Sequence, residues 1–342
     1  MNFTVQNNDY SNFNTPNGKR GDKTLYKLHE WINVKKLNLW SLSKNPNAID
    51  ILEENPQNIN WSMLSRNPNA IRILEKNLEK IDWYWLSENP NAIHLLEKNL
   101  DKIKWKCLSK NSNAIRILEK NPEKIDWSVL SSNPNAIQLL ENNVEKINWY
   151  WLSENPNAIH LLEKNLDKIN WCMLSGNPNA FCLLEKNLEK INWGVLSGNS
   201  HMIHLLEDNQ DKINWCMLSR NPSAIRLLEK NPEKIDWYWL CENPNAIDTL
   251  IHSDLNTSKH SYDKINWTKL SSNHKAIHLL EKNQNKINWF LLSVNSSIFR
   301  EEINYKFLGE RMNVIKEELI MNCMHPKRLE RWIEMGGNID DF

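Results

Sequence analysis

The chain has 342 residues, and its 42 lysine and arginine side chains equal its 42 aspartate and glutamate side chains in number. A formal net charge of zero excludes a general electrostatic attraction to nucleic acid or to an anionic membrane, although it leaves room for a local basic stripe. No stretch approaches the roughly 18 apolar residues of a membrane-spanning helix, and the six cysteines form no CxxC pair that would indicate a zinc site or a disulfide framework.

The first segment, residues 1–22, is polar and rich in asparagine and has no apolar core. This composition predicts a disordered N-terminal segment. It is also unlike a secretory signal peptide, so we expect an intracellular protein that is not secreted.

From residue 23 to residue 295 the sequence repeats every 22 residues, and each copy begins at a tryptophan. These tryptophans are Trp61, Trp83, Trp105, Trp127, Trp149, Trp171, Trp193, Trp215, Trp237, Trp267 and Trp289. One insertion, within residues 251–262, interrupts the period, and Leu39 takes the tryptophan position in a weaker first copy. About twelve repeats of this length predict a solenoid.

The second half of each repeat predicts a helix of about nine residues. In the copy that begins at Trp83, a stripe at helical spacing consists of Ala92, Ile93, Leu95 and Leu96. Asn89 is expected to cap the N-terminus, with Pro90 in the first turn. Asn99 is expected to end the helix in the left-handed conformation.

The first half of the repeat predicts a second, shorter helix, because Trp83 and Leu86 lie one turn apart and Asp82 can cap it. Such short helices are marginal alone, so stacking of repeats must stabilise them. We expect the tryptophans to lie in the core, because they keep their register while neighbouring positions vary. A dozen stacked repeats would give an elongated surface of about 100 Å if each advances by about 8–10 Å.

A leucine-rich-repeat horseshoe is the competing fold, since LSENPNAI resembles the strand-closing motif of such repeats and the period falls in their range. The L-x-L alternation that would form their strand is missing. We therefore favour an all-α solenoid of two-helix repeats.

The final segment, residues 296–342, departs from the repeat and is highly charged. It predicts two or three helices. We expect them to form a C-terminal helical cap that covers the exposed apolar face of the last repeat.

Residues 37–295 follow the pattern W-x-x-L-S-x-N-x-x-A-I-x-L-L-E-x-N. In this the chain resembles the tryptophan- and asparagine-rich short-repeat proteins of giant nucleocytoplasmic DNA viruses of amoebae, as does the ending from His325 to Trp332 with Gly336. The resemblance implies a viral helical-repeat protein without an assigned biochemical role, present in the host cytoplasm or packaged in the virion.

Two positions of the repeat vary while their neighbours stay nearly constant. The first follows the helix isoleucine, or its phenylalanine replacement, and is occupied by Arg72, His94, Arg116, Gln138, His160, Cys182, His204 and Arg226. The second follows the repeat tryptophan and carries the aromatic pairs Tyr84 and Trp85, Tyr150 and Trp151, and Tyr238 and Trp239. Variation within a fixed register predicts a recognition surface for a protein partner; a solvated face and packing between helices are the plainer interpretations.

Lysines also recur with the repeat and could follow a phosphate backbone; they are Lys80, Lys102, Lys124, Lys146, Lys168, Lys190, Lys212 and Lys234. A ladder of glutamates with the same period should largely cancel their field. His94, His160 and His204 lie two or three repeats apart, too far for a shared metal ion. We expect no catalytic, cofactor or metal site, and predict a non-enzymatic protein-interaction or scaffolding protein, with nucleic-acid binding by the lysines as the alternative.

Overall fold

A computed structural model describes residues 24–252, 264–303 and 325–336, with scattered positions between 309 and 321. The predicted disordered segment 1–22 lies outside the described residues, as do most of the insertion within 251–262 and much of the predicted cap 296–342. The chain divides into two units. Residues His29–Ile298 contain the repeats, and the described residues on either side of them belong to the second unit.

The predicted all-α solenoid is confirmed, since the structure is mostly helical and its helices recur with the repeat. The horseshoe alternative is wrong: within the described ranges the only strands are β1 and β2, and neither belongs to a repeat.

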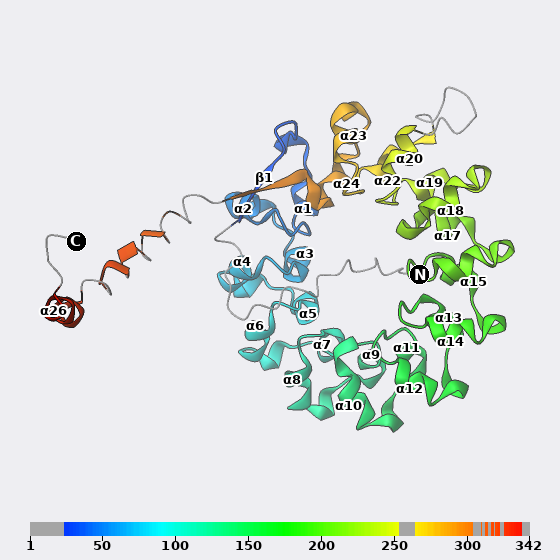
Figure 1. The fold of residues 1–342 in the computed structure, drawn as a ribbon, viewed down its shortest axis with the longest axis horizontal. Helices are drawn as coiled ribbons and strands as arrows, with labels where there is room; N and C mark the ends of the chain where they lie inside the picture. Colours follow the sequence, from blue (N-terminus) through cyan, green and yellow to red (C-terminus); the bar gives the residue numbers. More distant parts are fainter. Residues whose placement is uncertain are drawn as a thin grey trace. The chain divides into compact units, whose positions relative to one another are not determined.

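Each repeat begins with a short helix of an inner layer (Figure 1). These inner helices are α1 (Leu39–Leu42), α3 (Trp61–Arg66), α5 (Trp83–Glu88), α7 (Trp105–Lys110), α9 (Trp127–Leu130), α11 (Trp149–Leu152), α13 (Trp171–Gly176), α15 (Trp193–Ser197), α17 (Trp215–Arg220), α19 (Trp237–Leu240), α22 (Trp267–Leu270) and α24 (Trp289–Val294). The predicted cap of α5 is confirmed, because Asp82 accepts a hydrogen bond from the backbone N–H of Tyr84. Asn148 caps α11 by accepting from the backbone N–H of Trp151.

The second helix of each repeat belongs to an outer layer. These helices are α2 (Ile49–Glu54), α4 (Ile71–Glu75), α6 (Ile93–Glu97), α8 (Ile115–Glu119), α10 (Ile137–Glu141), α12 (Ile159–Glu163), α14 (Phe181–Glu185), α16 (Ile203–Glu207), α18 (Ile225–Glu229), α20 (Ile247–His252) and α23 (Ile277–Lys282). They begin later than the sequence predicts. Asn89 caps a tight turn instead of α6: its Oδ1 accepts from Asn91 N, and its carbonyl accepts from Ala92 N.

The predicted left-handed end of the outer helix is wrong. Asn99 has φ −137° and ψ 53°, and its side-chain amide donates to the Leu95 carbonyl at 2.9 Å. The side chain of Asn99 therefore supplies the hydrogen bond to a carbonyl of the last helical turn. The backbone can then enter a 3-10 turn directly. These connecting turns are η3 (Pro56–Asn58), η4 (Leu78–Lys80), η5 (Leu100–Lys102), η6 (Pro122–Lys124), η8 (Val144–Lys146), η9 (Leu166–Lys168), η10 (Leu188–Lys190), η11 (Gln210–Lys212), η13 (Pro232–Lys234) and η14 (Gln284–Lys286).

The core between the two layers consists of aliphatic side chains. Leu86, Ala92 and Leu96 are fully buried, and the equivalent positions are buried around the array. The repeat tryptophans are only half-buried, so their predicted place in the core is wrong. The reason is their position in the first turn of the inner helix, at the edge of the space that the leucines fill.

Buried asparagines and serines join each repeat to the one before it. Asn155 donates its side-chain amide to the carbonyls of Ser131 and Asn133, both at 3.0 Å. Ser153 donates its hydroxyl to the Trp149 carbonyl at 2.7 Å and accepts from the backbone N–H of Asn170 at 2.9 Å. We call this recurring set of bonds the asparagine ladder.

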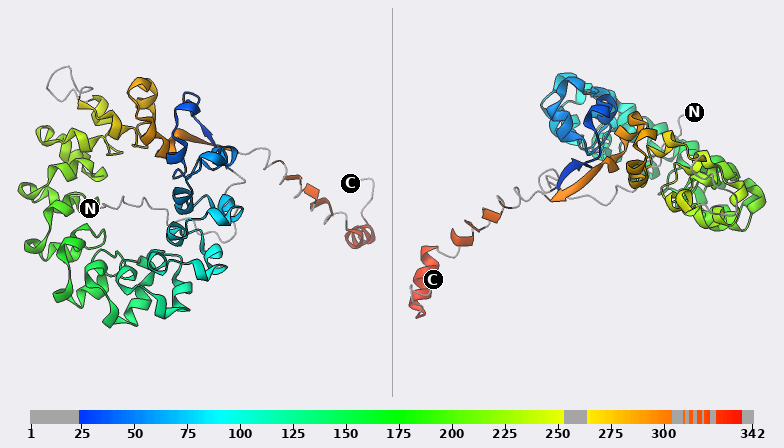
Figure 2. Two further views of the ribbon diagram at one scale, coloured as in Figure 1. Left: turned by 180° about the vertical axis from the view of Figure 1, so that it is seen from behind. Right: turned by 90° about the horizontal axis from the view of Figure 1, so that it is seen from above.

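The asparagine ladder also joins the two ends of the array. Asn45 donates to the carbonyls of Ser293 and Asn295 at 3.1 and 3.0 Å, and the N–H of Asn38 donates to Ser293 Oγ at 2.8 Å. These are the bonds that join consecutive repeats, and they place α1 against α24. The repeats therefore form a closed ring (Figure 1), seen from behind in Figure 2.

The expected elongated stack is thus wrong, and α1 occupies the face of the last repeat that we had assigned to the C-terminal cap. A solenoid curves because each interface adds a constant rotation, and twelve inner helices close when each step turns by about 30°. Many consecutive inner helices, such as α3 and α5 or α5 and α7, pack closely, whereas outer helices such as α4 and α6 make few contacts with each other. This difference in spacing bends the array toward its inner layer.

The second unit contains a two-stranded antiparallel sheet built from residues far apart in the sequence. β1 (Thr24–Leu28) pairs with β2 (Phe299–Ile303), with Thr24 opposite Ile303, and Lys27 forms an ion pair with Glu302 at 2.6 Å. Both segments fall in regions, 23–295 and 296–342, for which only helices were predicted, because a strand whose partner lies at the other end of the chain leaves no local signal. Helix α26 (Pro326–Glu334) lies in the region where we predicted helices.

The ladder yields a direct test of ring closure. Replacing Asn155 with alanine removes the side-chain donor of the Ser131 carbonyl, one of the two donors of the Asn133 carbonyl, and the acceptor of the Asn157 N–H. Each group left without a partner costs roughly 1–3 kcal/mol. We expect the free energy of unfolding, measured by urea denaturation, to fall by roughly 2–5 kcal/mol. Asn45→Ala should cost about as much, because Asn45 makes the same two bonds between the ends of the array.

Asn157→Ala is the matched control, since Asn157 is exposed and its side-chain amide donates one bond, to the Pro134 carbonyl. It should cost no more than about 1.5 kcal/mol. Normal stability of the Asn45 variant beside a destabilised Asn155 variant would show that the ring is open.

Candidate functional site

The first variable position lies on the outer helices, where all eight predicted residues are exposed: Arg72, His94, Arg116, Gln138, His160, Cys182, His204 and Arg226. Three of them contact the preceding outer helix. Arg72 pairs with Glu53 at 2.5 Å, and His94 and His160 bond to glutamates of the preceding repeat at 2.6 and 2.7 Å. This stripe is therefore partly engaged in ion pairs and hydrogen bonds between repeats.

The aromatic pairs lie on inner helices, so the structure does not bring the two predicted sets together. Tyr84, Tyr150 and Tyr238 are 50, 47 and 45% exposed. In each pair the tyrosine and tryptophan rings stand nearly perpendicular, with centroids 5.1–5.2 Å apart. Such edge-to-face contacts hold large apolar side chains in fixed orientations at the surface.

Sequence reasoning missed two members of the same surface. Trp40 and Phe290 occupy the position of Tyr84 in their repeats and are 53 and 50% exposed. Trp40 was overlooked because the tryptophan position before it is occupied by Leu39. Alignment of this copy by the following Leu42 and Ser43 would have identified it. The position lies about 200° around the helix from the buried leucine, so it faces away from the core. We call Trp40, Tyr84, Tyr150, Trp151, Tyr238 and Phe290 the aromatic surface.

The lysine ladder covers the repeat tryptophans. Lys168 Nζ lies 4.7 Å from the centre of the Trp149 ring, within the range of a cation–π interaction. The same contact recurs at 4.5–4.9 Å for Lys80, Lys102, Lys124, Lys146, Lys190, Lys212, Lys234, Lys264 and Lys286. Lys36 completes the series across the closure by contacting Trp289 at 5.1 Å.

The first repeat supports this role of the lysines. Where Leu39 replaces the tryptophan, Asn58 stands in the place of the lysine that would cover it. The two positions have changed together. The lysines are therefore part of the packing within each repeat as well as exposed cations.

Arginines cover two of the three tryptophans of the aromatic pairs. Arg66 lies 5.0 Å from the Trp85 ring and 3.6 Å from the carboxylate of Glu88. Sequence reasoning did not identify these residues. A signal was present, since the position before each ladder asparagine varies in charge from copy to copy.

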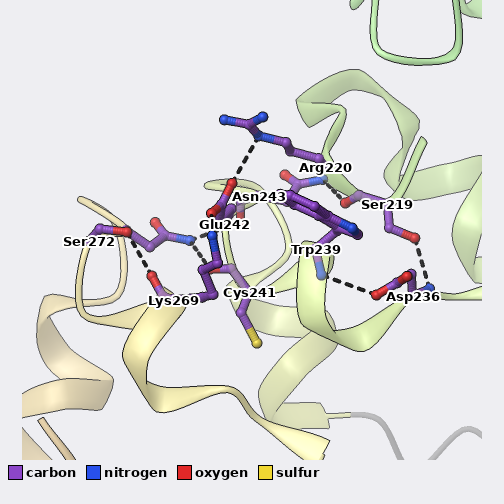
Figure 3. A network of polar contacts seen from close by, with 10 residues as sticks. Ser219, Arg220, Asp236, Trp239, Cys241, Glu242, Asn243, Lys269 and Ser272 are labelled. Atoms are coloured by element: carbon purple, nitrogen blue, oxygen red, sulfur yellow. Dashed lines mark hydrogen bonds and ion pairs between the residues drawn. The ribbon is translucent and has the colours of Figure 1, made fainter. Parts of the chain in front are cut away.

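The second of these sites lies around Glu242 (Figure 3), whose side chain is 16% exposed. Arg220 lies 5.6 Å from the Trp239 ring and 2.9 Å from the Glu242 carboxylate. Lys269 reaches the same carboxylate at 2.5 Å from the following repeat, and this hydrogen bond raises the pKa of Lys269. Glu242 thus has cations on both sides.

Cys241 takes the place of a ladder serine beside this site (Figure 3). Its thiol donates to the Trp237 carbonyl at 3.2 Å and accepts from Asn266 N at 3.3 Å. Burial raises the pKa of the thiol, so it stays protonated and can act as a donor. The ladder continues past the insertion, because Asn273 donates to the carbonyls of Cys241 and Asn243.

Searches for other kinds of site give little. No three His, Cys, Asp or Glu side chains lie close enough together to hold a metal ion in the described part of the chain. None of the described helices has the length and apolar character needed to cross a membrane. Comparisons with protein-family models, curated proteins and solved structures found no match.

The lysine contacts yield a double-mutant test. We expect Lys168→Asn to lower the free energy of unfolding by about 0.5–1 kcal/mol, because it uncovers the Trp149 ring. In a Trp149→Leu background, which recreates the natural pair Leu39 and Asn58, the same change should cost almost nothing. Urea denaturation of the four proteins measures the coupling, and equal costs in both backgrounds would show that the contact contributes no stability.

Proposed function

We propose that this chain is a non-enzymatic interaction ring that binds a protein partner through its aromatic surface. The observation that carries the proposal is the exposure, between 39 and 53%, of six large aromatic side chains on the inner helices. The fold does not require the five that directly follow the tryptophan position, because serine, glycine and threonine occupy this position in other repeats, and methionine, valine and lysine occupy the position of Trp151. Tyrosine and tryptophan are also the residues most often responsible for binding energy at protein interfaces.

The outer stripe is the weaker candidate for the main contact. Its ion pairs and hydrogen bonds are exposed, and exposed pairs contribute little energy. Arg116, Gln138, Cys182 and Arg226 could still add specificity at the edge of an interface. We therefore place the centre of the proposed interface on the inner layer.

Several observations favour a protein over nucleic acid as the partner. The lysines that could contact phosphates already lie on tryptophan rings, and glutamates or aspartates adjoin most of them in the sequence. The net charge is zero, whereas nucleic-acid binding depends on excess positive charge. Nucleic-acid binding thus becomes an outcome that the test below can reveal.

As part of the proposal, we infer from the resemblance to repeat proteins of giant viruses that the ring acts in the host cytoplasm or the virion. A closed ring whose inner helices expose large aromatic side chains suits a scaffold that presents one surface to another protein. The conclusion rests on the surface and does not depend on the viral origin.

Affinity capture from extracts of virus-infected cells, read by mass spectrometry, tests the proposal. We expect the variant Tyr84→Ala/Tyr150→Ala to lose the proteins that the unmodified ring captures, because it removes two anchors, while its melting temperature changes little. Arg116→Glu/His160→Glu is the control for the outer layer and should retain most of the capture.

Two results would contradict the proposal. Capture that survives in the tyrosine variant and is lost in the outer-layer variant would move the interface to the outer stripe. Nucleic acid that is recovered at low salt, released at high salt and lost on neutralising Lys124, Lys146 and Lys168 would favour the alternative function.

A further inference from the structure

Three repeats carry the same segment, Tyr-Trp-Leu followed by a serine or cysteine and a glutamate. The segments are 84–88, 150–154 and 238–242. In each, the glutamate lies three residues after the second tryptophan, on the same side of the inner helix. Because the local chemistry is the same, differences between the three copies arise from neighbouring repeats.

In two of these copies, which we call closed, an arginine of the preceding repeat covers the second tryptophan and its glutamate. It stands 22 residues before the glutamate, as Arg66 does before Glu88 and Arg220 before Glu242, and contacts both the tryptophan ring and the carboxylate. The third copy has Ser132 in this position. A serine hydroxyl is too short to reach Trp151 or to pair with Glu154.

The third copy is accordingly open. Trp151 is 39% exposed, whereas Trp85 and Trp239 are half-buried. Among the described residues no cation lies over the Trp151 ring, and the Glu154 carboxylate has no hydrogen bond and no ion pair within 4.0 Å. The next repeat places Gly176 at the equivalent position, so small residues flank Glu154 on both sides.

Glu154 is nevertheless only partly accessible to water. Burial raises the pKa of its carboxyl group, and the positive charge of Lys110, two repeats away, offsets part of this effect. A partly desolvated carboxylate gains more from a cationic partner than an exposed one does. The Trp151 ring and the Glu154 carboxylate are thus the same two groups that Arg66 and Arg220 contact in the closed copies.

We propose that Trp151 and Glu154 form a binding site for the guanidinium group of an arginine side chain on the partner protein. The inference deepens the proposed function and rests on it. A planar guanidinium can stack on an indole and at the same time donate to a carboxylate, whereas the ammonium of lysine does not stack. The chain itself uses arginine from the preceding repeat in both closed copies. In one of them Lys269 of the following repeat also lies 5.1 Å from the Trp239 ring and pairs with Glu242.

The site can be tested without the natural partner. The probe is the peptide acetyl-Gly-Arg-Gly-amide, added at millimolar concentration to the full-length chain labelled with ¹⁵N at its tryptophans. The Trp151 indole signal is assigned from its loss in Trp151→Phe. We expect this signal to shift saturably with the arginine peptide, and several-fold less at equal concentration with the matched lysine peptide.

Three variants make the test specific. Ser132→Arg supplies the missing arginine within the chain and should abolish the shift. Arg66→Ser removes a natural cover and should make the Trp85 signal respond to the peptide. Glu154→Gln keeps the shape but removes the charge, and should weaken binding about tenfold or more, as the loss of a hydrogen bond to a charged group does.

The inference fails if the Trp151 signal does not respond to the arginine peptide, or if Ser132→Arg or Glu154→Gln binds it as the unmodified chain does. A response that appears only after residues 1–23 are removed would assign the site to an arginine of this chain and overturn the partner assignment. If the peptide does not bind while protein capture still depends on Tyr84 and Tyr150, the proposed function stands and the arginine site alone is rejected.

Discussion

A buried carboxamide at the turn between the two helices of each repeat determines how one repeat sits on the next. Asn155 makes three hydrogen bonds there: its amide donates to the carbonyls of Ser131 and Asn133, and its oxygen accepts from the N–H of Asn157. Aspartate has no donor, serine has one, and glutamine is a methylene longer. This requirement accounts for the regular asparagines better than helix capping does. It also fixes the rotation between repeats, on which the closure of the ring depends.

The sequence predicts the period, the two helices, the caps of the inner helices and the all-helical class, because these follow from local spacing and local hydrogen bonds. It does not predict closure, since that depends on a rotation accumulated over twelve interfaces. One signal was overlooked. The first copy retains Asn45, although an open stack would give its amide no acceptor. The strand pair was missed because β1 and β2 lie at opposite ends of the repeat array.

The candidate site was predicted in part. The change of residue type at a fixed position of the repeat identified Tyr84 and Trp85. It could not show that they lie on a different layer from His94. The contact of Arg66 with Glu88 depends on which residues become neighbours 22 positions apart, and only the stacked structure reveals this. The constancy of the tryptophans was misread as a sign of the core. Trp149 is half-buried, and it has a constant partner in Lys168, which packs on its ring.

Closure also has a consequence for the history of the sequence. The segments Trp83–Ile103 and Trp149–Ile169 are identical, as expected after a recent tandem duplication. An open stack can gain or lose a copy at little cost, because its ends simply move. A ring cannot, since a thirteenth step would leave the two ends overlapping unless every interface changed its angle. The insertion between α20 and α22 adds residues without adding a step, so the ladder continues across it. The geometry of the ring therefore fixes the number of repeats in such a protein. New binding specificity must come from substitution at surface positions.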